Sequence, residues 1–112
     1  MAVFIYDKTV RAEFDDRALA HLQVVILAKL RRGESFSFSW SKRAPQVGRT
    51  TVWLSPSIPL IFDFGTKDAP ELDRDWLELL SRVANSNAGL RLVPTDAESD
   101  VDLTSSTHIG SP

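Results

Sequence analysis

Polar and apolar residues alternate strictly between Ser35 and Ser41. Phe36, Phe38 and Trp40 fall on one side of an extended chain, and the four serines fall on the other. Because successive side chains of a strand point to opposite faces, this pattern predicts a strand with one face in the core. Shorter runs of β-forming residues predict five further strands, at 3–6, 9–14, 49–54, 60–64 and 90–93.

Helical spacing begins after the acidic pair Asp15-Asp16 and continues to Arg32, just before Gly33. The acidic pair suits the positive end of a helix, and the basic residues before Gly33 suit the negative end. The main apolar stripe of this helix comprises positions 19, 22, 26 and 30, and Val24 and Leu27 lie largely off it. A helix that is apolar on more than one side packs against two layers or against another subunit. The pattern therefore leaves open whether Val24 and Leu27 complete the core or form a homo-oligomer contact.

A second helix is predicted from an N-cap at Asp73 to about Asn87, with Trp76, Leu80 and Val83 on one face. The resulting order, β-β-α-β-β-β-α-β, predicts an α+β domain with two helices packed on a largely antiparallel sheet. A chain of 112 residues has room for one domain, which we place at residues 1–94. Residues 95–112 are polar, show no apolar periodicity and are expected to be disordered.

The net charge of −2 hides an uneven distribution along the chain. All 13 basic residues precede position 95, whereas four of the 15 acidic residues lie in the short tail: Asp96, Glu98, Asp100 and Asp102. Between positions 29 and 49, Glu34 is the single acidic residue among six basic ones, which are Lys29, Arg31, Arg32, Lys42, Arg43 and Arg49. We call these six residues the basic stretch.

Composition excludes several classes of function. The chain has no cysteine, so disulfides and thiolate sites are excluded, in keeping with a reducing compartment. The N-terminus has no basic segment of a signal peptide, and the longest aliphatic run, at 24–28, is far short of the roughly 20 residues of a membrane span. We therefore expect a cytoplasmic protein without a membrane partner.

No group of residues has the spacing of a catalytic or metal site. His21 falls within the first helix and lacks recognisable partners for a triad or a metal ion, so a helix-surface or hydrogen-bonded structural role is favoured. Asp15 and Asp16 could act as a carboxylate pair, but their place before a helix favours capping. The five glycines form no phosphate-binding motif. We predict no catalytic residue, metal or cofactor.

The basic stretch has two interpretations. It could bind phosphate groups, with Trp40 or Trp53 as stacking platforms for bases. Alternatively, its helix-end charges complement the helix dipole, the other charges are solvated, and the tryptophans lie in the core. The sequence alone leaves both open.

Three segments together resemble a known family: Phe14-Asp-Asp-Arg-Ala-Leu-Ala-His-Leu-Gln-Val-Val-Ile26, then Lys29-Leu-Arg-Arg-Gly-Glu-Ser-Phe36 leading to Ser39-Trp40, then Gly48-Arg-Thr-Thr-Val-Trp-Leu54. With the ending Gly89-Leu90…Val93-Pro94, the chain is similar over residues 3–94 to short actinobacterial proteins without established function. Members of that family often carry the automatic label "ATP-dependent DNA ligase". The resemblance implies no catalytic or binding residues.

The ligase label can be compared with the chemistry that it requires. ATP-dependent ligases attach AMP to a lysine in a Lys-x-Asp-Gly motif. The four lysines here begin the sequences Lys8-Thr-Val-Arg, Lys29-Leu-Arg-Arg, Lys42-Arg-Ala-Pro and Lys67-Asp-Ala-Pro, and none matches. The sequence therefore favours a self-associating, non-enzymatic binding module that contacts nucleic acid or an acidic partner. The alternatives are an enzyme or accessory subunit of DNA end-joining, and a structural or stress-associated oligomer without a ligand.

Overall fold

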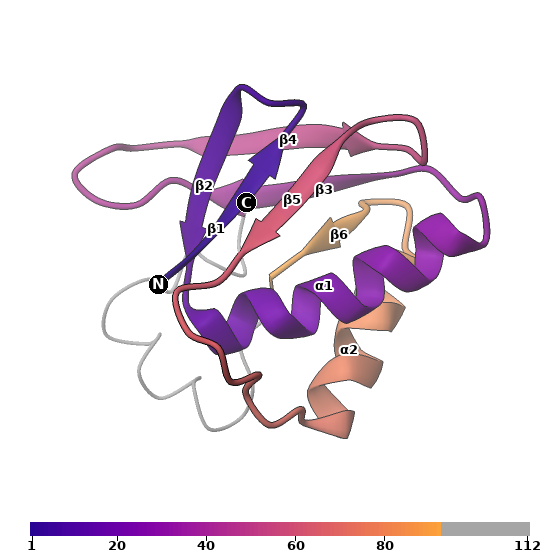
Figure 1. The fold of residues 1–112 in the computed structure, drawn as a ribbon. Helices are drawn as coiled ribbons and strands as arrows, with labels where there is room; N and C mark the ends of the chain where they lie inside the picture. Colours follow the sequence, from indigo (N-terminus) through magenta and orange to yellow (C-terminus); the bar gives the residue numbers. More distant parts are fainter. Residues whose placement is uncertain (93–112) are drawn as a thin grey trace.

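The structure is a computed structural model that describes residues 1–92 (Figure 1). Its elements are β1 (Ala2–Tyr6), β2 (Val10–Phe14), α1 (Asp16–Arg31), β3 (Phe36–Ser41), β4 (Arg49–Leu54), β5 (Leu60–Asp63), α2 (Arg74–Ala84) and β6 (Leu90–Arg91). The predicted α+β class and element order are confirmed. The tail predicted to be disordered, 95–112, lies outside the described residues. Neither described helix has the length and apolar character needed to cross a membrane.

The six strands divide into two three-stranded sheets, in the orders β2-β1-β5 and β4-β3-β6. Four strand pairings hold the sheets together, and three of them are antiparallel. The exception is the short pairing of β6 with β3, which is parallel and sets Phe38 opposite Leu90 and Ser39 opposite Arg91. The largely antiparallel character is as predicted, while the division into two sheets is a feature that the strand pattern does not specify.

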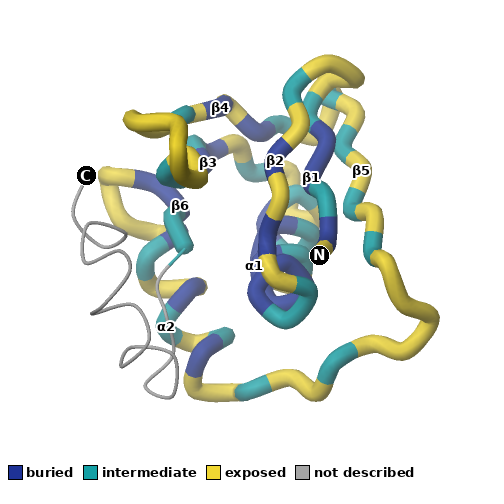
Figure 2. Tube along the Cα trace, turned by 90° about the vertical axis from the view of Figure 1, so that its left-hand side faces the viewer, coloured by how far each residue is buried: buried dark blue, intermediate teal, exposed yellow. Residues whose placement is uncertain are grey.

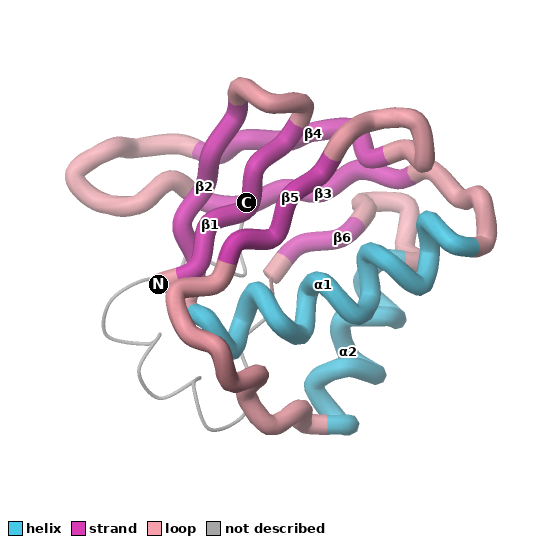
Figure 3. The backbone as a smooth tube through the Cα atoms, viewed as in Figure 1, coloured by secondary structure: helices cyan, strands magenta, loops and turns pink. Residues whose placement is uncertain are grey.

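The core lies between the inner faces of the two sheets, α1 and the inward side of α2, which are arranged as in Figures 1, 2 and 3. The Phe4 ring meets the Phe38 ring edge-on, with centroids 5.5 Å apart at 86°. Phe14 and Trp40 extend this aromatic contact, with their ring centroids 6.0 Å apart. The alternation of β3 is the cause, because it directs Phe36 and Phe38 inward and leaves the serines on the outer face.

The first hairpin turns at Asp7 and Lys8, and β2 begins at Val10, one residue later than the strand predicted at 9–14. Both residues have positive φ, 49° and 71°. Two left-handed residues match the right-handed twist of the flanking strands, which is the geometry of a primed turn. The turn is built without glycine, so its backbone conformation is held by the ladder from Tyr6–Val10 to Ala2–Phe14.

The two helices are capped by aspartates and joined by a histidine. Asp15 and Asp73 are the N-caps of α1 and α2, as predicted. His21 is fully buried, and its Nε2 accepts a hydrogen bond from the backbone N–H of Asp73 at 2.8 Å. Its Nδ1–H therefore donates to the Arg17 carbonyl at 2.7 Å, which leaves both ring nitrogens satisfied. His21 thus has the structural role that the sequence favours.

The second helix is shorter than predicted, because α2 ends at Ala84 rather than near Asn87. Asn85 is the C-cap, and its N–H still bonds to the Ser81 carbonyl at 3.1 Å. The Ser86 hydroxyl then donates to the Val83 carbonyl at 2.7 Å, which satisfies an acceptor that another helical turn would have used. The chain reverses at Gly89, with φ of +84°, and enters β6.

Candidate anion-binding groove

The structure divides the basic stretch into two groups with different surroundings. The first group lies where α1 ends, and we call it the helix-end cluster: Lys29, Arg32, Glu34 and Asn85. Lys29 is only 7% exposed, and its Nζ donates to Glu34 Oε1 at 2.9 Å and to Asn85 Oδ1 at 2.7 Å. Arg32 Nε donates to Glu34 Oε2 at 2.9 Å. Glu34 therefore neutralises much of the charge that the sequence concentrates here.

The pKa of the Glu34 carboxyl reflects the two cations that are bonded to it. Hydrogen bonds from Arg32 and then Lys29 lower the pKa of the Glu34 carboxyl from 4.5 to about 2. In turn, the hydrogen bond to Glu34 raises the pKa of Arg32. Arg31 is exposed at the same helix end. Lys29 and Arg32 therefore act mainly to hold together the C-terminal ends of α1 and α2 and the segment that leads into β3.

The second group lines a groove of about 500 Å³ on the outer face of the β4-β3-β6 sheet, which we call the arginine groove. Its cations are Arg43 from the β3–β4 loop, Arg49 from β4 and Arg91 from β6. The hydroxyls of Ser37, Ser39, Ser41 and Thr51 stand between the arginines, and Trp40, Phe14 and Leu92 supply apolar walls. The three serines belong to the polar face of β3 that the alternation predicts.

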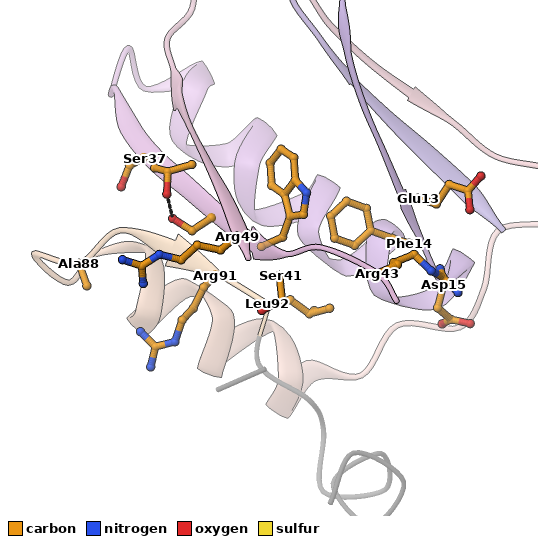
Figure 4. A pocket seen from close by; sticks show the side chains of 13 residues that line it. Glu13, Phe14, Asp15, Ser37, Ser41, Arg43, Arg49, Ala88, Arg91 and Leu92 are labelled. Atoms are coloured by element: carbon orange, nitrogen blue, oxygen red, sulfur yellow. Dashed lines mark hydrogen bonds between the residues drawn. The ribbon is translucent and has the colours of Figure 1, made fainter. Parts of the chain in front are cut away.

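Strand register brings these side chains together. Ser39 of β3 lies opposite Thr51 on one side and Arg91 on the other, and Ser41 lies opposite Arg49. The Ser39 and Thr51 hydroxyls hydrogen-bond at 2.7 Å. Figure 4 shows Arg49 and Arg91 projecting in the same direction, with Arg43 at the other end near Glu13 and Asp15. The groove therefore has a cationic end and a mixed end.

The three arginines of the groove lack the ion pairs that the helix-end cluster has. Within residues 1–92, none of Arg43, Arg49 and Arg91 is ion-paired to a carboxylate. Arg91 Nε is also buried without a hydrogen-bond partner in this part of the chain. A buried donor without an acceptor costs about 1–3 kcal/mol. This is the feature of the groove that points most directly to a ligand.

Gly89 lies close against Ser37, a residue of the groove wall. A methyl group at Gly89 would collide with the Ser37 hydroxyl and lie 2.8 Å from its carbonyl oxygen. The residue also has φ of +84°, a conformation that side chains disfavour. Only glycine lets the α2–β6 connection approach β3 this closely, and that approach places Arg91 beside Ser39.

A second hollow of about 620 Å³ adjoins the arginine groove and lies between β2 and the β3–β4 loop. The two share Glu13, Trp40, Ser41 and Arg43 in their walls. The second hollow adds two cations, Arg11 and Lys42. Together they form one path, lined by five basic residues and by the acidic residues Glu13 and Asp15.

The tryptophans differ in their exposure. Trp76 is buried in the core between the helices, at 2% exposed. Trp40 is half-buried, packs on Phe4 and Phe14, and presents part of its ring to both hollows. Trp53 is 56% exposed and lies opposite Ser37 on the outer face of the sheet. Trp40 therefore lines both hollows, whereas Trp53 lies on the same outer face without lining either of them.

The six residues of the basic stretch thus fall in two places. Lys29, Arg31 and Arg32 are at the helix end, and Lys42, Arg43 and Arg49 border the path just described. Arg91 belongs to the same site but was missed, because it is a lone basic residue 42 positions beyond Arg49 (91 minus 49). The alternation Leu90-Arg91-Leu92 was the available signal, since it directs Arg91 to the face opposite buried Leu90.

The two residues predicted for self-association lie elsewhere, on α1. Val24 is 40% exposed and Leu27 is half-buried. Nothing in the structure tests their contact with another subunit, so self-association stays a prediction. Within the described residues, no group of three or more histidine, aspartate or glutamate side chains is placed to hold a metal ion.

Comparison with known proteins assigns the chain to a family. A model of a domain of unknown function, DUF7882, matches residues 1–95. The chain belongs to this family. No similar sequence was found among curated proteins, and no similar structure among solved ones. The match covers the whole fold of this DUF7882 domain, and it does not bear on the actinobacterial origin or the ligase label that the resemblance implies.

Proposed function

We propose that this DUF7882 domain is a non-enzymatic binding module whose arginine groove holds an extended anionic chain, single-stranded nucleic acid. The observation that carries the proposal is that one groove contains three arginines without an ion pair in the described chain: Arg43, Arg49 and Arg91. Guanidinium groups and hydroxyls are the side-chain groups that most often contact phosphate oxygens. The helix-end cluster contributes less, because Glu34 already occupies Lys29 and Arg32.

An extended ligand is favoured by the shape of the site. The arginine groove continues into the second hollow along Arg43, and cations line both parts. Aromatic rings beside a cationic track suit single strands, whose unpaired bases stack on them at roughly 1–3 kcal/mol per base. Trp40, which lines both hollows, and the exposed Trp53 of β4 are the rings proposed for that role. The recurring phosphates of one strand match the arginines better than a single small anion would.

The test is a titration of a fluorescein-labelled 12-nucleotide thymidine oligomer, followed by fluorescence anisotropy at about 50 mM salt. We expect micromolar binding whose affinity falls with salt at a log–log slope of about −2, from about −0.7 for each of three phosphates. A poly-glutamate peptide of equal charge is the comparison ligand. Equal or tighter binding of the peptide would replace nucleic acid with an acidic protein partner, and absence of binding to either would overturn the proposal.

Self-association is the second part of the proposed function, and it concerns a different surface. Replacement of Val24 and Leu27 by glutamine is expected to convert a homo-oligomer to monomer in light scattering, with the thermal transition preserved. Val47→Gln removes a valine that is 90% exposed in the β3–β4 loop and serves as the control for lost apolar surface. A wild-type protein that is already monomeric at micromolar concentration contradicts this part alone.

The DNA end-joining alternative is placed second. It rests on the label of the resembling family, and no lysine occurs in a Lys-x-Asp-Gly motif. Lys29, moreover, is buried and bonded to Glu34 and Asn85, which leaves it unavailable for attack on ATP. Covalent labelling of the protein after incubation with ATP and Mg²⁺ would place the DNA end-joining function ahead of the binding module.

A further inference from the structure

The chain carries, directly after its last strand, a segment whose charges complement the arginine groove. Acidic residues occupy every second position from 96 to 102, as Asp96, Glu98, Asp100 and Asp102, and no basic residue lies among them. An extended chain with this pattern presents its carboxylates on one face, at intervals of about 6.7 Å. We infer that this acidic segment is a ligand of the arginine groove within the same chain, competing there with external anions. The inference rests on the anion-binding function proposed above.

The point of attachment supports this assignment. Leu92, the last residue that the structure describes, is itself in the wall of the arginine groove. Because β6 runs parallel to β3, it heads in the direction that β3 takes toward Ser41 and the loop with Arg43. The four residues from Leu92 to Asp96 can span up to about 14 Å. The acidic positions are thus tethered within reach of the cations.

Charge balance supports it as well. No described carboxylate forms an ion pair with Arg43, Arg49 or Arg91. Arg91 Nε is moreover buried without an acceptor among the described residues. Residues 1–92 carry 13 basic and 11 acidic residues, and the segment adds four negative charges. Pairs between exposed arginines and carboxylates contribute little stability, typically under about 1 kcal/mol each. The segment therefore suits a reversible competitor rather than a fixed part of the core.

The tether strengthens this weak competition. A short tether between two binding groups gives an effective concentration in the millimolar range. For a segment that alone binds with a dissociation constant near 0.2 mM, the apparent affinity for an external strand falls roughly fivefold to tenfold. The same reduction fades above about 0.3 M salt, where screening shortens the range of charge interactions.

The experiment neutralises the segment in the full chain: Asp96→Asn, Glu98→Gln, Asp100→Asn and Asp102→Asn. The matched control makes the same change of four charges at exposed positions of the body: Asp63→Asn, Asp68→Asn, Glu71→Gln and Glu78→Gln. With the thymidine oligomer at about 50 mM salt, we expect the tail variant to bind roughly fivefold to tenfold more tightly than wild type and the body variant to change less than about twofold. Equal gains in both variants would mean a general charge effect and would overturn the inference.

A second readout separates this inference from the proposed function. Amide resonances of Ser37–Ser41 and Arg91 are compared between wild type and the tail variant without nucleic acid, and a synthetic peptide of residues 93–104 is added to the tail variant. We expect the peptide to shift these resonances back toward their wild-type positions. Shifts without oligomer binding would keep the inference and discard nucleic acid as the ligand. Oligomer binding without any shift would discard the inference and keep the proposed function.

Discussion

The helix-end cluster and the arginine groove are both rich in basic side chains, yet they differ in what surrounds them. At the helix end, one carboxylate and one amide hold Lys29 and Arg32 at distances of 2.7–2.9 Å. In the groove, three arginines stand among hydroxyls without an ion pair in the described chain. The difference teaches that a run of basic residues in the sequence does not form one charged surface in the folded protein. Its ability to bind anions is decided by which charges already have partners.

The largest expected contrast compares two double variants that remove the same charge. Arg49→Ala with Arg91→Ala should weaken oligomer binding at least tenfold, because each lost phosphate contact of an arginine is worth about 1 kcal/mol or more at low salt. Arg31→Ala with Arg32→Ala should weaken it less than about threefold, through long-range charge only. Anisotropy titrations at one salt concentration measure both. Equal losses in the two variants would erase the distinction between the clusters.

A pair of glycine substitutions compares the backbone of the two regions. Gly89→Ala should lower the free energy of unfolding by about 2–3 kcal/mol, because a positive φ and a collision with Ser37 act together. Gly33→Ala at the helix end has φ of +78° but nothing within 4 Å, so about 1 kcal/mol is expected. Urea denaturation provides the values. A Gly89 variant no less stable than the Gly33 variant would show that the α2–β6 connection can move away from β3.

Lys29→Met tests whether the helix-end cluster is structural. Methionine keeps the apolar stem of this buried residue but removes the ammonium group, which leaves Asn85 Oδ1 without its donor and Glu34 with Arg32 as its remaining donor. We expect a loss of about 1–2 kcal/mol in unfolding free energy. Oligomer affinity should stay within about twofold of wild type. A stable variant with strongly reduced binding would assign Lys29 to the ligand site instead.

The smallest effect concerns acid stability at the helix end. The pKa of Glu34 is lowered to about 2 in the folded protein by hydrogen bonds from Arg32 and Lys29. A lowered pKa stabilises the folded state fully above the unfolded value near 4.5, and this contribution disappears as the pH falls toward 2. Glu34→Gln should therefore flatten the pH dependence of stability between about 4.5 and 2. Glu78→Gln removes an equal charge elsewhere, and an identical profile for both variants would contradict the assignment.

The local pattern of the sequence predicted most of the fold, and it did so where one segment determines its own structure. The alternation at 35–41 predicted both the inner aromatic face of β3 and its outer serine face. Asp15 and Asp73 marked the starts of the helices, because capping depends on neighbouring residues only. The C-terminal end of α2 was misjudged, since the Ser86 hydroxyl competes with the next turn of the helix.

What could not be predicted depends on contacts between distant segments. The site needs Arg91 beside Ser39, and that contact arises from a parallel pairing between residues 52 positions apart (91 minus 39). Strand patterns indicate which face a residue occupies but not which strand lies next to it. Likewise, Lys29 donates one of its hydrogen bonds to Asn85, which lies at the end of the other helix. The basic stretch therefore suggested the site without showing which of its members belong to it.

Because β6 is only two residues long, it affects the stage of folding at which the arginine groove is complete. Its ladder closes a long loop and rests on few hydrogen bonds at the edge of a sheet, so we expect β6 to be among the last elements to form and the first to open. During synthesis, Arg49 leaves the ribosome well before Arg91, and the nascent chain carries an unfinished groove. The proposed binding of an anion by all three arginines would thus require a domain that has completed its folding.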